Sequence, residues 1–77
     1  MNERLLDVFK RTLELNDIDE NVSQLNCSKW DSLNHLNLAV EIENEYNITL
    51  EPEDIGKIKK FSDAEEIVFE KLTNDSI

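Results

Sequence analysis

Residues 31–46 read DSLNHLNLAVEIENEY, and this stretch decides the fold. Asp31 is a favoured N-cap residue, because its carboxylate can accept hydrogen bonds from the free N–H groups of a first helical turn. The residues after it place apolar side chains at helical spacing. The sequence therefore predicts a helix over residues 32–46 with Ser32 at its N-terminal rim. The helix dipole and free N–H groups favour a phosphate there, so Ser32 is well placed to carry a phosphodiester.

Apolar side chains cover more than half the circumference of this helix and form two groups, which lie at about 140–240° and about 300–360° on a helical projection. A helix in a small bundle rarely buries so much of itself. The group expected in the core is the longer one and includes an aromatic ring; it consists of Leu38, Ala39, Ile42 and Tyr46. The other group consists of Leu33, Leu36 and Val40. We expect it to form an exposed strip beside Ser32, and such strips mark partner sites. The alternative is that neighbouring helices bury both groups.

The rest of the chain has the pattern of helices joined by polar loops. It holds one glycine and one proline, and it lacks the β-branched alternation and turn dipeptides that strands need. We predict an all-α fold, a small four-helix bundle with three main helices and one short helix, in a single domain over residues 1–77. The helices are expected at residues 2–15, 32–46, 52–58 and 63–72, with a frayed tail over residues 73–77.

Local signals indicate several helix ends. Asn47 is a plausible stop for the helix over residues 32–46. Pro52 suits a first helical turn, because its missing N–H would be unpaired there. Ser62 and Glu65 form a capping box that predicts the start of the last helix. Outside residues 32–46, the side chains expected to pack on the core from the helices and the long polar connection are Leu5, Leu6, Phe9, Thr12, Leu13, Ile18, Val22, Leu25, Trp30, Ala64, Ile67, Val68 and Leu72.

Composition narrows the classes of function. The chain has 77 residues, with 18 acidic against 8 basic side chains and a net charge of −10. Nucleic acid and anionic lipid would repel it, whereas basic protein surfaces would attract it; the alternative is that the charge only keeps a small protein soluble. Cys27 is the single cysteine and His35 the single histidine, so neither an internal disulfide nor a structural zinc site is expected. The sequence shows neither a signal peptide nor a long apolar span, so we expect a cytoplasmic protein that does not insert into membranes. We also expect it to be a monomer.

Catalytic and metal patterns are weak. Ser32 and His35 are three residues apart on the predicted helix, but a nucleophile and base also need an orienting group and an oxyanion site. Asp17, Asp19 and Asn21 resemble the start of a calcium loop, yet its glycine and its final glutamate are missing. We therefore expect no enzyme and no metal site; a small hydrolase built on Ser32 and His35 is the rival hypothesis.

Beyond these local patterns, the chain resembles the acyl carrier protein family over about residues 31–68. The resemblance is carried by a D-S-L motif, an acidic amphipathic helix that ends in an acidic residue and an aromatic one, and an extended link into a short helix. The matching residues are Asp31, Ser32, Leu33, Leu36, Leu38, Ile42, Glu43, Glu45, Tyr46, Ile48, Leu50, Pro52, Glu53, Asp54 and Ile55. The D-S-L motif alone is weak, but its spacing to the later segments makes the match specific.

The resemblance implies a four-helix bundle with a 4′-phosphopantetheine arm on Ser32, attached from coenzyme A by a phosphopantetheinyl transferase. The terminal thiol of the arm would carry acyl groups as thioesters and present them to acyl-loading and acyl-using enzymes with basic docking surfaces. Asp31 matches the acidic residue beside the modified serine. The residues that match the docking positions of the family are Leu33, Leu36, Val40 and Glu43.

Departures from the family pattern point to a specialised carrier. Asn34, Asn37 and Asn44 stand where carriers of fatty-acid synthesis usually have acidic residues, and Lys29-Trp30 replaces small residues. The resemblance then favours service to enzymes of a specialised pathway, such as lipid, polyketide, peptide or polysaccharide modification. An aminoacyl or peptidyl carrier, and an unmodified helical adaptor with the same fold, remain as alternatives.

Overall fold

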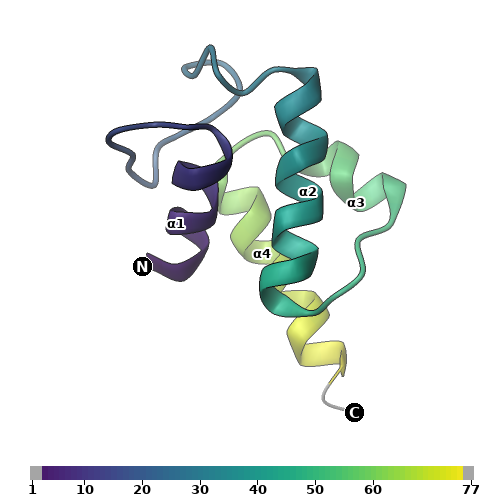
Figure 1. The fold of residues 1–77 in the computed structure, drawn as a ribbon. Helices are drawn as coiled ribbons and strands as arrows, with labels where there is room; N and C mark the ends of the chain where they lie inside the picture. Colours follow the sequence, from purple (N-terminus) through teal and green to yellow (C-terminus); the bar gives the residue numbers. More distant parts are fainter. Residues whose placement is uncertain (1–2, 76–77) are drawn as a thin grey trace.

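The computed structural model describes residues 3–75, which form four helices (Figure 1). These are α1 (Glu3–Thr12), α2 (Ser32–Tyr46), α3 (Pro52–Lys57) and α4 (Phe61–Asp75). Within this described part the only β pairing is an isolated antiparallel bridge between Ser23 and Lys60. The all-α fold with three main helices and one short helix is confirmed. Residue 2 of the first expected helix and residues 76–77 of the expected tail lie outside the described residues.

The core lies between α1, α2 and α4, and three aromatic rings occupy its centre. Phe9 of α1 packs edge-on against Trp30, with ring centroids 5.3 Å apart, and against Phe61, at 5.2 Å. Edge-to-face pairs of this kind add stability beyond the area that they bury. Trp30 belongs to the loop before α2, so the packing of its ring on Phe9 fastens that loop to α1.

The first helix is shorter than the expected residues 2–15, and Glu14 is the reason. Glu14 adopts a left-handed backbone conformation with φ of 54°. Its N–H donates to the carbonyl of Arg11 at 3.3 Å, and the Leu15 N–H donates to the carbonyl of Lys10 at 3.0 Å. These two bonds form a Schellman motif, which satisfies the last carbonyl groups and turns the chain out of the helix. On the core face, Val8 is buried, although the predicted apolar stripe omitted it.

The last helix begins two residues earlier than expected and extends into the expected tail. The capping box predicted from Ser62 is wrong: Ser62 lies inside the first turn, and the Asp63 carboxylate accepts the N–H of Lys59 at 3.0 Å. The physical reason is Phe61, which is completely buried and whose N–H donates to the Val22 carbonyl at 3.0 Å. At the other end, residues 73–75 are helical, so fraying from residue 73 is also wrong.

Two apolar residues expected in the core are exposed. Leu25 is 99% exposed and Leu72 is 43% exposed. Leu25 sits at the tip of the turn between Ser23 and Asn26, whose backbone and side chain bond each other, so its side chain points away from the bundle. Leu72 follows the buried Val68 by one turn, near the end of α4.

In the link from α2 to α3, alternate side chains point into the core. Asn47 ends α2 in the left-handed conformation, with φ of 55°, as its sequence position predicts. Ile48 and Leu50 are buried, and Pro52 opens α3. The short helix ends at Lys57, one residue before the expected end, because Ile58 is extended and buried.

One carboxylate of the short helix α3 ties it to α4. Asp54 Oδ2 accepts the N–H of Glu51 at 3.0 Å and lies 2.9 Å from Lys71 Nζ of α4. The Lys71 ammonium and then the Glu51 N–H bond hold the pKa of Asp54 below its ordinary value of 3.8. The ionised carboxylate is therefore favoured in the folded state over the unfolded state.

We expect Asp54→Asn to lower the stability of the protein at neutral pH and to flatten its loss in acid. A lowered folded-state pKa contributes stability that is present above pH 3.8 and is lost as the pH falls through the folded-state pKa. Urea unfolding between pH 6 and pH 2.5 measures this, with Glu66→Gln, at an exposed carboxylate of α4, as the control. Parallel curves for the wild type and Asp54→Asn would contradict the linkage.

Candidate functional site

Ser32 is exposed at the first position of α2, and Asp31 caps the helix in front of it. Asp31 is extended, its Oδ1 accepts the N–H of Asn34 at 2.9 Å, and its carbonyl accepts the N–H of His35 at 2.8 Å. The N-cap predicted from the sequence is confirmed. The first turn of α2 contains no acidic side chain, so the Asp31 carboxylate at the N-cap is the acidic group that faces the positive end of the helix dipole.

The loop before Ser32 is braced from both sides. On one side the Trp30 ring is buried against Phe9, and the backbone N–H of Trp30 donates to the Cys27 carbonyl at 3.1 Å. On the other side Asn34 donates from its side chain to the Lys29 carbonyl at 2.7 Å, and Asn37 donates to the Asn34 side chain at 3.1 Å. Two asparagines that depart from the acidic family pattern thus fix the loop that presents Ser32.

His35 links the loop before α2, α2 itself and α3, and in the described part of the chain it forms no hydrogen bond to Ser32. Trp30 Nε1–H donates to its Nδ1 at 3.0 Å, and its Nε2 lies 2.8 Å from the Ile55 carbonyl of α3. Because the indole N–H is only a donor and the carbonyl only an acceptor, this network assigns the proton of the neutral ring to Nε2. Both ring nitrogens are engaged away from Ser32, so the geometry gives the hydrolase hypothesis no base.

The two apolar groups of α2 separate as predicted. Leu38, Ala39 and Ile42 are buried, with at most 3% of their surface exposed, whereas Leu33, Leu36 and Val40 are 69%, 57% and 51% exposed. Tyr46, placed in the core group, is only partly buried. Its outer face is covered by the Arg4 guanidinium, 4.5 Å from the ring centre. The division into a core face and an exposed strip beside Ser32 is confirmed.

Two acidic side chains of α2 bind groups from other parts of the chain. Glu45 Oε2 lies 2.7 Å from Arg4 Nε of α1, and this bond lowers the pKa of Glu45. Glu43, predicted as a docking residue, is half-buried, and its Oε2 accepts the N–H of Leu50 at 2.8 Å. A substitution of Glu43 would therefore disturb the link to α3 as well as remove a charge.

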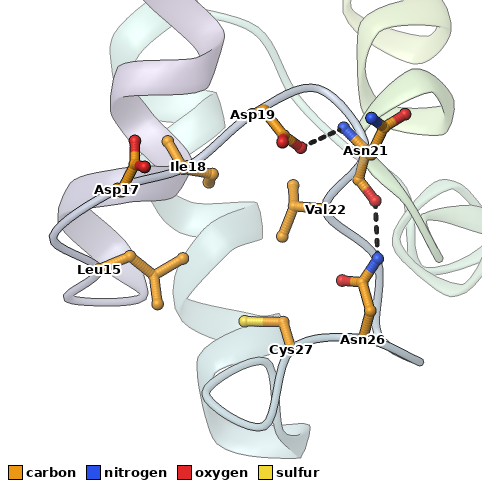
Figure 2. A pocket seen from close by; sticks show the side chains of 8 residues that line it. All are labelled: Leu15, Asp17, Ile18, Asp19, Asn21, Val22, Asn26 and Cys27. Atoms are coloured by element: carbon orange, nitrogen blue, oxygen red, sulfur yellow. Dashed lines mark hydrogen bonds between the residues drawn. The ribbon is translucent and has the colours of Figure 1, made fainter.

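A hollow of about 430 Å³ is lined by the loop between α1 and α2, and Ser32 is not part of its lining (Figure 2). Its polar side chains build the loop itself: Asp19 accepts the N–H of Asn21 at 2.9 Å, and Asn26 donates to the Asn21 carbonyl at 2.8 Å. Within the described residues no group of three or more histidine, cysteine or carboxylate side chains is arranged to hold a metal ion. No described helix combines the length and apolar character that a membrane crossing requires.

A second hollow, of about 590 Å³, opens directly beside Ser32. Its lining comes from the loop and from the first turns of α2, and consists of Gln24, Trp30, Asp31, Ser32, His35 and Leu36. Gln24 was not among the predicted site residues, and no local pattern in the sequence marks it. It lines the same hollow as Ser32, and its loop is held against residues 59–60 by the bridge at Ser23 and by the bond from its own N–H to the Lys59 carbonyl at 3.0 Å.

With this geometry in place, the chain can be compared with known proteins. The chain is similar to the solution NMR structure of a holo acyl carrier protein from Geobacter metallireducens, with a TM-score of 0.84 and 28% sequence identity. The match covers 95% of this chain and 86% of that chain. No protein-family model and no curated protein matches the chain.

Proposed function

This chain is acyl-carrier-protein-like in its fold, and we propose that it is a carrier protein with a 4′-phosphopantetheine arm on Ser32. Such an arm supplies a terminal thiol that holds acyl groups as thioesters. The observation that carries the proposal is the exposed Ser32 hydroxyl at the capped start of α2, in a chain that matches a holo acyl carrier protein with a TM-score of 0.84.

The residues present at this site fit the group. A phosphodiester on Ser32 would lie at the positive end of the α2 dipole, where an anion is stabilised. Asp31 binds the N–H of Asn34 and so keeps the first turn in shape for the attachment. Attachment would form a P–O bond to Ser32 Oγ and break the pyrophosphate P–O bond of coenzyme A. The adenosine bisphosphate half of coenzyme A would leave, and the hydroxyl proton would pass to a base of the transferase.

Partner enzymes would dock on the exposed strip of α2. Leu33, Leu36 and Val40 form an apolar surface beside Ser32, so a partner that covers them also reaches the arm. The net charge of −10 would steer the carrier toward basic surfaces on the transferase and on acyl-loading or acyl-using enzymes, and away from nucleic acid. Cys27 is a free thiol, which suits a monomeric carrier in the reducing cytoplasm.

A role in a specialised pathway is part of the proposal. Asn34 and Asn37 brace the loop before Ser32 instead of adding negative charge near the docking strip. Enzymes that use this carrier would then depend less on acidic contacts in this region and more on the apolar strip. An aminoacyl or peptidyl carrier would use the same serine and the same strip.

Intact-protein mass spectrometry tests the proposal. Folded protein incubated with coenzyme A, Mg²⁺ and a broad-specificity phosphopantetheinyl transferase should gain the mass of one arm, and peptide mapping should place it on Ser32. An unmodified helical adaptor would keep its original mass. An arm on another serine, or none on folded protein, would overturn the proposal.

A further inference from the structure

Gln24 and the indole of Trp30 compete for one acceptor in the hollow beside Ser32. Trp30 Nε1 lies 3.0 Å from His35 Nδ1, and Gln24 Nε2 lies 3.2 Å from the same atom. A neutral imidazole nitrogen offers a single lone pair, so two N–H donors share it. The Gln24 amide has the longer bond and comes from an exposed side chain, so it is the donor that a ligand carbonyl can draw away.

The walls of this hollow suit an elongated ligand with both apolar and amide groups. One wall is Leu36, which is 57% exposed. Another is the half-buried ring of His35, which stacks on Trp30 with centroids 6.1 Å apart, and Trp30 itself contributes only the 4% of its surface that is exposed. The volume of about 590 Å³ falls within the range of roughly 300–1,000 Å³ that is usual for small-molecule sites. Ser32 lies in the wall, so anything attached to its hydroxyl starts at the mouth of the hollow.

His35 directs the ligand toward the loop. Its Nε2–H donates to the Ile55 carbonyl at 2.8 Å and ties α2 to α3, whereas the hollow lies between α2 and the loop residue Gln24. On the α3 side, a group attached to Ser32 is therefore blocked by the bond between His35 and Ile55. On the loop side it finds an open, partly apolar surface.

We propose that the hollow formed by Gln24, Trp30, His35 and Leu36 is a resting site for the arm on Ser32. An amide carbonyl of the pantetheine part accepts a hydrogen bond from the Gln24 side chain, and its methyl groups pack on Leu36, on the His35 ring and against the small exposed part of Trp30. The Trp30 indole N–H is then the single donor to His35 Nδ1. This inference rests on the proposed function, because it needs an arm on Ser32.

The single tryptophan makes the proposal testable by NMR, because its indole N–H gives one unambiguous signal. When the arm draws Gln24 away, the Trp30–His35 bond should strengthen and the indole proton should move downfield. Contacts between the Trp30 ring protons and the arm methyl groups should appear as nuclear Overhauser effects in the modified protein only. Gln24→Ala should move the indole proton downfield even without the arm. It should also reduce the ratio of docked to free arm about fivefold, the effect of losing one ordinary hydrogen bond.

Two controls isolate the contribution of Gln24 and of the arm. Asn44→Ala removes an exposed amide from the far end of α2 and should leave the signals of both forms unchanged. Ser32→Glu adds negative charge without an arm and should not reproduce the shift. Protein that carries the arm by mass but keeps its original indole signal and shows no contacts would overturn the resting site while leaving the carrier function intact. An equal shift in Ser32→Glu would assign the effect to charge and also overturn it. Failure of the arm to attach at all would instead overturn the carrier function.

Discussion

Replacing Ser32 with alanine is expected to abolish attachment of the arm completely and to leave the fold unchanged. The hydroxyl is the proposed attachment point, and alanine offers no oxygen to form the phosphodiester. The side chain is exposed, and the cap of α2 comes from Asp31, whose carboxylate binds the Asn34 N–H at 2.9 Å. The free energy of unfolding should therefore change by only about 0.5 kcal/mol or less. Intact mass and urea unfolding measure the two effects.

Ser62 provides the matched control for this substitution. It is also an exposed serine in the first turn of a long helix, α4, but Asp31 and the apolar strip have no counterpart around it. Ser62→Ala should accept one arm as fast as the wild type. If Ser62→Ala blocks modification and Ser32→Ala does not, the site has been assigned to the wrong helix.

The second large effect is expected from the two faces of α2. Leu38 and Ile42 are 1% and 0% exposed, so Leu38→Ala and Ile42→Ala should each cost about 2–5 kcal/mol of stability. That loss is a large part of the total stability of a small domain. Leu36→Ala and Val40→Ala, at half-exposed positions of the same helix, should change stability by about 0.5 kcal/mol. Chemical denaturation of the four variants measures the contrast.

The same four variants separate folding from docking. Leu36→Ala and Val40→Ala should weaken binding to the transferase, because they trim the strip that a partner would cover. Both variants should keep the wild-type fold, and an unchanged far-ultraviolet circular dichroism spectrum would show this. Unfolding of Leu36→Ala together with a harmless Ile42→Ala would mean that the two faces had been exchanged.

The sequence predicts the fold well where a residue type and its required conformation coincide. Asp31 is a good N-cap and caps α2, and Asn47 tolerates the left-handed conformation that ends the same helix. The helical period also separates Leu38 from Leu36. Each of these inferences depends only on neighbours along the helix, so a single sequence contains the needed information.

The errors arise where contacts distant in sequence decide the structure. Glu14 adopts a left-handed conformation that its residue type does not favour, so the early end of α1 had no local signal. The start of α4 follows from Phe61, which packs on Phe9 at 5.2 Å, and overrides the capping box at Ser62. Gln24 joins the site through the pairing of its loop with residues 59–60. The bond between His35 and Ile55 likewise needs α3 to be in place.

The bracing of the loop before Ser32 has a consequence for how cargo is handed over. Trp30 fixes this loop to the core, and Asn34 fixes it to α2, so the root of an arm on Ser32 would be a stationary point. A partner enzyme would then order little of the protein when it docks, and less conformational entropy opposes binding. Once such an arm has left its resting site, the volume that its thiol can sweep would be set by the length of the arm, measured from one fixed origin. Partners with different reaction centres would have to bring those centres within that sphere, because the carrier itself does not reach toward them.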